Sequence, residues 1–154
     1  MARYGAGVTR SGINTADTAY FNLMGGTGDR LLIRQIIVSI AVAPTTAPQF
    51  YLVRTTARGT QASTLAGLPL DIVDPAAVGT LDVCGTGASQ PTFTNTAWIQ
   101  TGALAVTAGG AFIWTFWDLP LIVPATAANG LAVANDLASG ATTGTFNCSY
   151  LWDE

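Results

Sequence analysis

From residue 18 onward, the hydrophobic residues of this chain come in short runs that are rich in Val, Ile, Thr, Phe, Tyr and Trp. Clusters of Gly, Pro, Asn and Asp separate the runs, and no segment repeats its apolar residues with the 3.6-residue period of a helix. These residue types favour strands, and the spacing of the turn signals is typical of a sandwich or barrel. The sequence therefore predicts an all-β, antiparallel fold, with strands at 18–24, 30–42, 49–57, 79–84, 92–100, 103–107, 111–117, 121–123, 130–135 and 143–152.

The first 17 residues lack this pattern. They contain three glycines but no sustained period, so we expect an extended N-terminal arm at 1–17 in front of one β-domain at 18–154. The net charge of the chain is −3; Arg3 and Arg10 give residues 1–16 a charge of +2, which leaves −5 for the remainder. A floppy terminus and a positive arm on an acidic neighbouring surface both fit this distribution. Under either interpretation, deletion of the arm leaves folding intact.

The composition removes most of the common catalytic devices. The chain has no His and no Lys, so it holds no imidazole base or ligand and no lysine nucleophile. Two cysteines, Cys84 and Cys148, are too few for a Cys-only zinc site or an iron–sulfur cluster. They pair only if strands 79–84 and 143–152 adjoin, and buried free thiols are the more frequent outcome for such cysteines.

A pair of carboxylates is the one catalytic device that the composition leaves open. Asp71 and Asp74 are three residues apart in a turn-like segment that continues with Pro75. A glycosidase needs two such groups across a cleft, and this spacing in a loop does not establish one. Asp74 before a proline is typical of a turn, and Asp71 of a surface acid or a cap. We therefore expect no enzymatic activity, no cofactor and no metal ion.

The balance of charged and apolar residues points to a protein partner. An acidic chain lacks the basic footprint that nucleic acids require, and charged residues, prolines and glycines interrupt every stretch long enough to span a membrane. However, 49% of the residues are hydrophobic and only 10% are charged. We expect such a chain to cover part of its surface with copies of itself or with another protein, and to bind neither nucleic acid nor membrane.

The most aromatic strand, 111–117, is apolar on both faces. Phe112, Trp114 and Phe116 share one face, whereas Ile113 and Trp117 occupy the other. A two-sheet sandwich covers only the inner faces of its strands. Residues 31–42 are also apolar on both faces, so their outer face needs a cover too. Either the long loop 58–78 covers the backs of both strands, or another subunit does. We expect a homotrimer, with Phe112, Trp114 and Phe116 at the trimer interface.

The layout as a whole resembles small jelly-roll decoration, or cement, proteins of tailed bacteriophages, which form trimers like those of tumour necrosis factor. The resemblance covers about residues 18–154 and rests on these segments: 31–38 (LLIRQIIV), 50–60 (FYLVRTTARGT), 68–71 (LPLD) with 74–77 (DPAA), 120–124 (PLIVP) leading to 129–131 (NGL), and 149–154 (SYLWDE).

The resemblance implies an antiparallel jelly-roll sandwich and a structural role in the virion, with assembly in the host cytoplasm. The partners it implies are two further copies of the chain and the major capsid protein, and we expect Arg3 and Arg10 of the arm to contact the capsid. Two other classes stay open. One is a carbohydrate-binding jelly roll, for which Trp98 is the suggestive residue, and the other is a receptor-binding fibre head, although the chain contains no shaft repeat.

Overall fold

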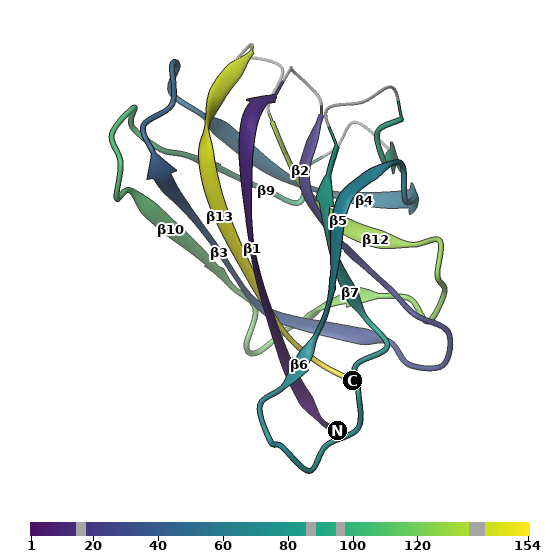
Figure 1. Ribbon diagram of the computed structural model, residues 1–154. Coiled ribbons are helices and arrows are strands. Elements are labelled where there is room, and N and C mark those ends of the chain that lie inside the picture. The colour runs from purple at the N-terminus through teal and green to yellow at the C-terminus, as the bar shows by residue number, and fades with distance from the viewer. Residues whose placement is uncertain (15–17, 86–88, 95–97, 136–140) are drawn as a thin grey trace.

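The computed structural model describes residues 1–14, 18–85, 89–94, 98–135 and 141–154, which form two antiparallel sheets packed face to face as a β-sandwich (Figure 1). The described residues contain no helix, and therefore none that is long and apolar enough to cross a membrane. The prediction of an all-β sandwich is confirmed.

The strands divide between the sheets as follows. The first sheet has the order β10 (Ala111–Thr115), β3 (Leu31–Val42), β13 (Thr142–Asp153), β1 (Arg3–Asn14) and β6 (Leu68–Pro69), and β11 (Leu121–Val123) pairs with β3 beside β10. The second sheet has the order β5 (Gln61–Ala66), β7 (Thr80–Cys84), β2 (Ala19–Met24), β12 (Gly130–Asn135), β4 (Gln49–Ala57) and β8 (Thr92–Phe93), and β9 (Gln100–Ala103) pairs with β4. Because β1 to β4 and β11 to β13 alternate between the sheets, most connections cross the sandwich.

Aromatic side chains fill the space between the sheets. The rings of Tyr20, Phe50 and Phe146 form the centre, with centroids 5.0–5.5 Å apart in tilted and edge-to-face arrangements. The hydroxyl of Tyr150, on the first sheet, donates a hydrogen bond to the carbonyl of Leu131 on the second, at 3.1 Å. Aromatic pairs in these geometries contribute about 0.5–1.5 kcal/mol each beyond the area they bury. They fix how the two sheets lie on each other.

The first strand is a correction to the sequence analysis, because residues 3–14 belong to the sandwich and are not an arm beside it. β1 pairs with β13 without interruption from Arg3 opposite Asp153 to Asn14 opposite Thr142. Tyr4 and Ala6 are buried in the main core. The two chain ends consequently lie side by side at the lower end of the molecule (Figure 1), where the amide of Ala2 donates to the carbonyl of Glu154 at 3.0 Å.

The segment 58–78 also differs from the expected loop. It contains β5, at the edge of the second sheet, and β6, which pairs with β1 at the edge of the first sheet opposite β10. It therefore does not cover the backs of β3 and β10. The alternative in which the segment 58–78 covers the backs of these two strands is therefore wrong.

Both cysteines are free and buried. Cys84 ends β7 in the second sheet and Cys148 lies on β13 in the first, so their strands do not adjoin. Burial raises the pKa of the Cys84 thiol to about 12 and raises that of Cys148 as well. Since the thiolate is the reactive form, both thiols are inert in the folded chain.

Because β1 belongs to the sandwich, we expect its deletion to impair folding, whereas the arm interpretation expects no effect on folding. Deleting residues 2–14 should abolish cooperative unfolding, because β13 loses the partner on one side and the core loses Tyr4. The milder variant Tyr4→Ala should lower the free energy of unfolding by about 3–5 kcal/mol. Urea denaturation followed by circular dichroism measures both, with the exposed Ser11→Ala as control, for which the change should be within about 0.5 kcal/mol. A truncated chain as stable as the full one would restore the arm interpretation.

Candidate interaction surface

The outer face of the first sheet, formed by β1, β13, β3 and β10, carries no charged side chain over most of its length. The register places Gly7, Ser149, Ile37 and Ile113 in one row across the four strands. The next row is Gly5, Leu151, Gln35 and Thr115, and the row on the other side is Thr9, Asn147, Ser39 and Ala111. None of the stretches that these rows span contains a charged residue, and Arg10, which follows Thr9, belongs to the buried side of β1. We call these three rows the outer face.

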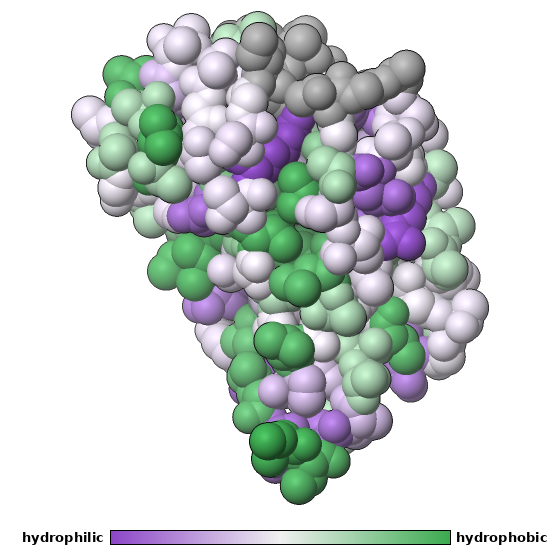
Figure 2. Space-filling view, viewed as in Figure 1, coloured by the Kyte–Doolittle hydropathy of each residue, from purple (hydrophilic) through white to green (hydrophobic). Residues whose placement is uncertain are grey.

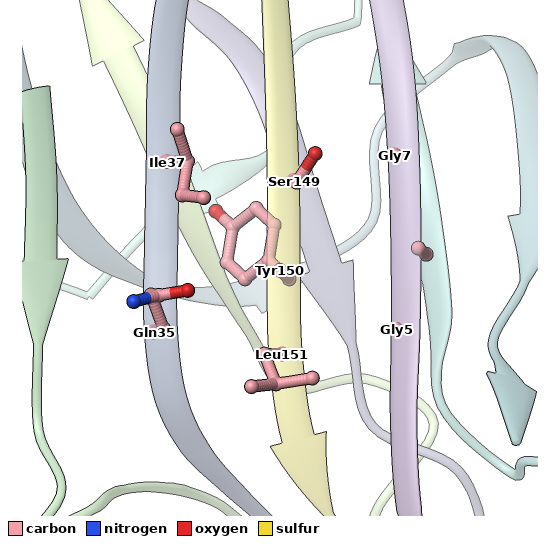
Figure 3. A pocket seen from close by; sticks show the side chains of 8 residues that line it. Gly5, Gly7, Gln35, Ile37, Ser149, Tyr150 and Leu151 are labelled. Carbon is pink, nitrogen blue, oxygen red and sulfur yellow. The ribbon is translucent and has the colours of Figure 1, made fainter. Parts of the chain in front are cut away.

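A shallow hollow of about 270 Å³ lies on this face where β1 has no side chains (Figure 3). Gly5 and Gly7 line it on β1, Gln35 and Ile37 on β3, and Ser149 and Leu151 on β13. A Cβ atom at position 7 would lie 3.0 Å from Oγ of Ser149, so the strand accepts a side chain there only if the serine shifts. The glycines leave the backbone of β1 open to close approach by another molecule.

Apolar side chains surround the hollow and continue past the ends of the strands. Ile113 is 55% exposed, Trp117 45% and Leu119 83%, and Leu68 and Leu70 are exposed on and just after β6. Figure 2 shows hydrophobic surface at the centre of this view and again at the lower tip of the molecule. Large exposed apolar patches on a soluble chain mark sites of interaction.

An ion-pair cluster closes the lower end of the outer face. The carboxylate of Asp153, 3% exposed, accepts hydrogen bonds from Nε of Arg3 at 2.6 Å and from Nε of Arg34 at 2.7 Å. Arg34 also donates to the carbonyl of Trp117 at 2.8 Å, and the guanidinium of Arg3 lies 5.3 Å from the centre of the Trp117 ring. The two arginines thus hold the segment after β10 against the ends of β1 and β13.

These contacts determine the acidity of Asp153. Burial alone would raise the pKa of its carboxyl group, but the hydrogen bonds and charges of Arg3 and Arg34 outweigh burial and hold the pKa below its ordinary value. The carboxylate is therefore the form that the folded chain stabilises.

The residues expected at a trimer interface face the other way. Trp114 is 9% exposed and belongs to the main core, and Phe112 packs with its ring centroid 5.7 Å from that of Phe50. Phe116 is also packed against this core. The residues of the same segment that are open to a partner are Ile113 and Trp117. The bulkier set fills the sandwich, and the smaller set faces outward.

The two arginines assigned to a capsid-binding arm are already engaged within the chain. Arg10 is 5% exposed; its Nη1 donates to the carbonyl of Ala19 at 3.0 Å, and its guanidinium lies 5.2 Å from the centre of the Tyr20 ring. Burial lowers the pKa of Arg10. Arg10 is therefore not available to a capsid, and the prediction was wrong for it. Arg3 keeps a half-exposed side chain but binds Asp153.

The two carboxylates considered for catalysis, Asp71 and Asp74, lie in a turn after β6. The carboxylate of Asp71 accepts a hydrogen bond from the amide of Val73 at 3.2 Å, and the carbonyl of Asp71 accepts one from the amide of Asp74 at 3.0 Å. This segment is therefore a turn, as predicted. No group of three or more His, Cys, Asp or Glu side chains is placed to hold a metal ion within the described part of the chain. The chain matches no protein-family model, and a search of curated proteins finds no match.

The ion-pair cluster predicts a defined dependence of stability on pH. Because the pKa of Asp153 is lowered on folding, its contribution is fully present above the ordinary carboxyl pKa of about 3.9 and is lost as the pH falls through the lower folded value. Asp153→Asn should therefore cost about 2 kcal/mol at pH 7, and the difference from the unsubstituted chain should shrink below about pH 4. Urea unfolding at several pH values tests this. The exposed Asp118→Asn is the control, and a difference that does not depend on pH would contradict the assignment.

Proposed function

We propose that the chain is a structural protein that assembles as a homotrimer through the outer face and binds the outside of a bacteriophage capsid, where it stabilises the shell. The observation that carries the proposal is the uncharged outer face, with its small residues and exposed Ile113. Charged residues are depleted at the centres of protein interfaces, and glycine and serine let two backbones approach closely. A face of this kind suits another copy of the chain better than it suits water.

The size of the face indicates how far the interface extends. Four strands about 4.8 Å apart and about five residues long span about 19 by 17 Å, or about 320 Å². A stable interface buries about 800 Å² on each partner. The outer face alone is too small, so the interface has to include the exposed side chains next to it, Trp117 and Leu119 beyond β10 and Leu70 beyond β6.

The strand order supports the finer assignment of the fold. The sequence β10-β3-β13-β1 in one sheet and β2-β12-β4 in the other, with consecutive strands crossing between them, fits a jelly roll. This is the fold implied by the resemblance to phage decoration proteins, and those proteins form trimers. A trimer over a junction of capsid subunits adds contacts that must be lost before the shell opens, so the shell ruptures more slowly.

The contact with the shell is assigned to the apolar tip, which we define as Leu70, Ile72 and Val73. Ile72 is 94% exposed and Val73 is 83% exposed. The turn that carries them is ordered, because Asp71 accepts hydrogen bonds from the amides of Val73 and Asp74. The hydroxyl of Tyr4 anchors the end of the turn through the carbonyl of Pro75 at 3.0 Å. An ordered loop loses little conformational entropy on binding. In this proposal the apolar tip contacts the capsid, in place of Arg3 and Arg10.

The first test concerns the oligomeric state. Sedimentation velocity at about 10 µM should give a trimer for the unsubstituted chain, and Ile113→Asp should weaken association at least about tenfold, because it buries an unpaired charge in the interface. Leu65→Asp is the matched control: Leu65 is 39% exposed on β5, away from the outer face, and its substitution should leave the trimer intact. A stable monomer of the unsubstituted chain at this concentration would refute the trimer.

The second test concerns the capsid. Shells assembled without this protein should take up the unsubstituted chain, and the double variant Ile72→Ser, Val73→Ser should show occupancy reduced about tenfold or more while remaining trimeric. Val106→Ser, at another exposed residue, should bind like the unsubstituted chain. Failure of the unsubstituted chain to bind would refute the capsid role. Equal occupancy of the double variant would refute only the assignment to the tip.

A further inference from the structure

A second surface feature lies on the opposite side of the sandwich, on the outer face of the second sheet. Trp98 is 43% exposed, and its ring is stacked on that of Tyr51 with centroids 4.8 Å apart and an angle of 23° between the planes. Tyr51 itself is buried and contacts Phe93 edge to face. One face of the Trp98 indole therefore lies on the ring of Tyr51, and the residue remains partly open to solvent.

A hollow of about 180 Å³ adjoins the indole, lined by Gln49 of β4 and by Thr101, Gly102 and Ala103 of β9. The register pairs Gln49 with Ala103 and Tyr51 with Thr101, so these side chains lie on the same face of the sheet as Tyr51. A Cβ atom at position 102 would point to the inner side of the sheet and lie 3.0 Å from the Phe112 ring, so a larger residue there requires that ring to shift. The small side chain of Ala103 keeps the floor of the hollow low.

Three polar side-chain groups around this hollow make no hydrogen bond to the described part of the chain. In the described part of the chain, neither the amide of Gln49, nor the hydroxyl of Thr101, nor the indole N–H of Trp98 has a hydrogen-bond partner. None of the lining residues is charged. A flat aromatic surface beside a neutral amide and a neutral hydroxyl is the arrangement that suits a neutral ligand with one apolar face and hydroxyl groups along its edge.

We propose that this surface, Trp98 with Gln49 and Thr101, is a binding site for a neutral saccharide built from pyranose rings. The axial hydrogens of such a ring form an apolar face that packs on the indole, and its equatorial hydroxyls reach the amide of Gln49 and the hydroxyl of Thr101. A proline-rich peptide also packs on aromatic rings, but it requires a groove between aromatic ridges. Here Tyr51 is buried beneath Trp98, and a single exposed ring remains. The site is independent of the proposed trimer, because it lies on the other sheet.

The experiment titrates the ¹⁵N-labelled full chain with cellohexaose, chitohexaose and a proline-rich peptide, followed by ¹H–¹⁵N NMR. At least one saccharide should shift the Trp98 indole N–H and the Gly102 amide, with a dissociation constant of about 1 mM. Trp98→Ala should weaken binding at least about tenfold. Leu65→Ala, a substitution of an exposed residue on β5 at the far edge of the second sheet, should leave it unchanged.

Because Trp98 covers Tyr51, its replacement by alanine also removes packing from the sheet, so a second variant separates binding from packing. Thr101→Val keeps the volume of the side chain and removes only the hydroxyl, and it should weaken saccharide binding several-fold with an unchanged free energy of unfolding. The proposal is overturned if neither saccharide shifts the two signals, if the shifts persist in Trp98→Ala, or if only the proline-rich peptide binds.

Discussion

The antiparallel pairing of β1 with β13 is the interaction on which the rest of this structure depends. It joins the two ends of the chain along twelve residue pairs and places β13 between β3 and β1, so the outer face exists only when the pairing has formed. The entropy lost in closing so long a loop rises only slowly with loop length, so the long separation costs little stability. It does affect kinetics, because strands that are far apart in sequence pair late and slowly.

Three strands were predictable because their signals are local. Residues 49–57, 121–123 and 130–135 carry continuous apolar runs between clear turn signals, and the observed strands have the same bounds. β1 was missed because Gly5 and Gly7 hide its alternation: Tyr4, Ala6 and Val8 pack on the core, while the residues between them are small or polar. Gly5 and Gly7, which line the hollow on the outer face, are thus also the residues that weaken the strand signal.

The edge strands β5, β8 and β9 were not predicted correctly, for a different reason. β5 is exposed or half-buried along its whole length, so its residues carry no apolar period at all. Residues 92–100 were predicted as one strand, but they contribute β8 and the first residue of β9, which pair with different parts of β4. Such strands are specified by the neighbour they pair with, and a single sequence does not contain that information.

The direction in which the aromatic strand faces follows from volume rather than from alternation. The period of two separates Phe112, Trp114 and Phe116 from Ile113 and Trp117 but does not say which set points inward. The set with three rings fills the space beside Phe50, and the reverse orientation would leave a cavity there and three rings in water. Comparing the side-chain volumes on the two faces of this strand is therefore enough to place Ile113 on the surface from the sequence alone.

The two outer faces of the sandwich differ in what covers them. On the second sheet, Tyr51, Val53 and Cys84 belong to a small buried cluster that the chain covers itself, with Phe93 packed against it. On the first sheet, the described part of the chain places no such cover over Ile37, Leu151 and Ile113. A chain with 10% charged residues has few means of making a bare apolar face soluble. The proposed trimer is therefore assigned to the uncovered face, because a closed ring of identical subunits would cover such a face without leaving another exposed.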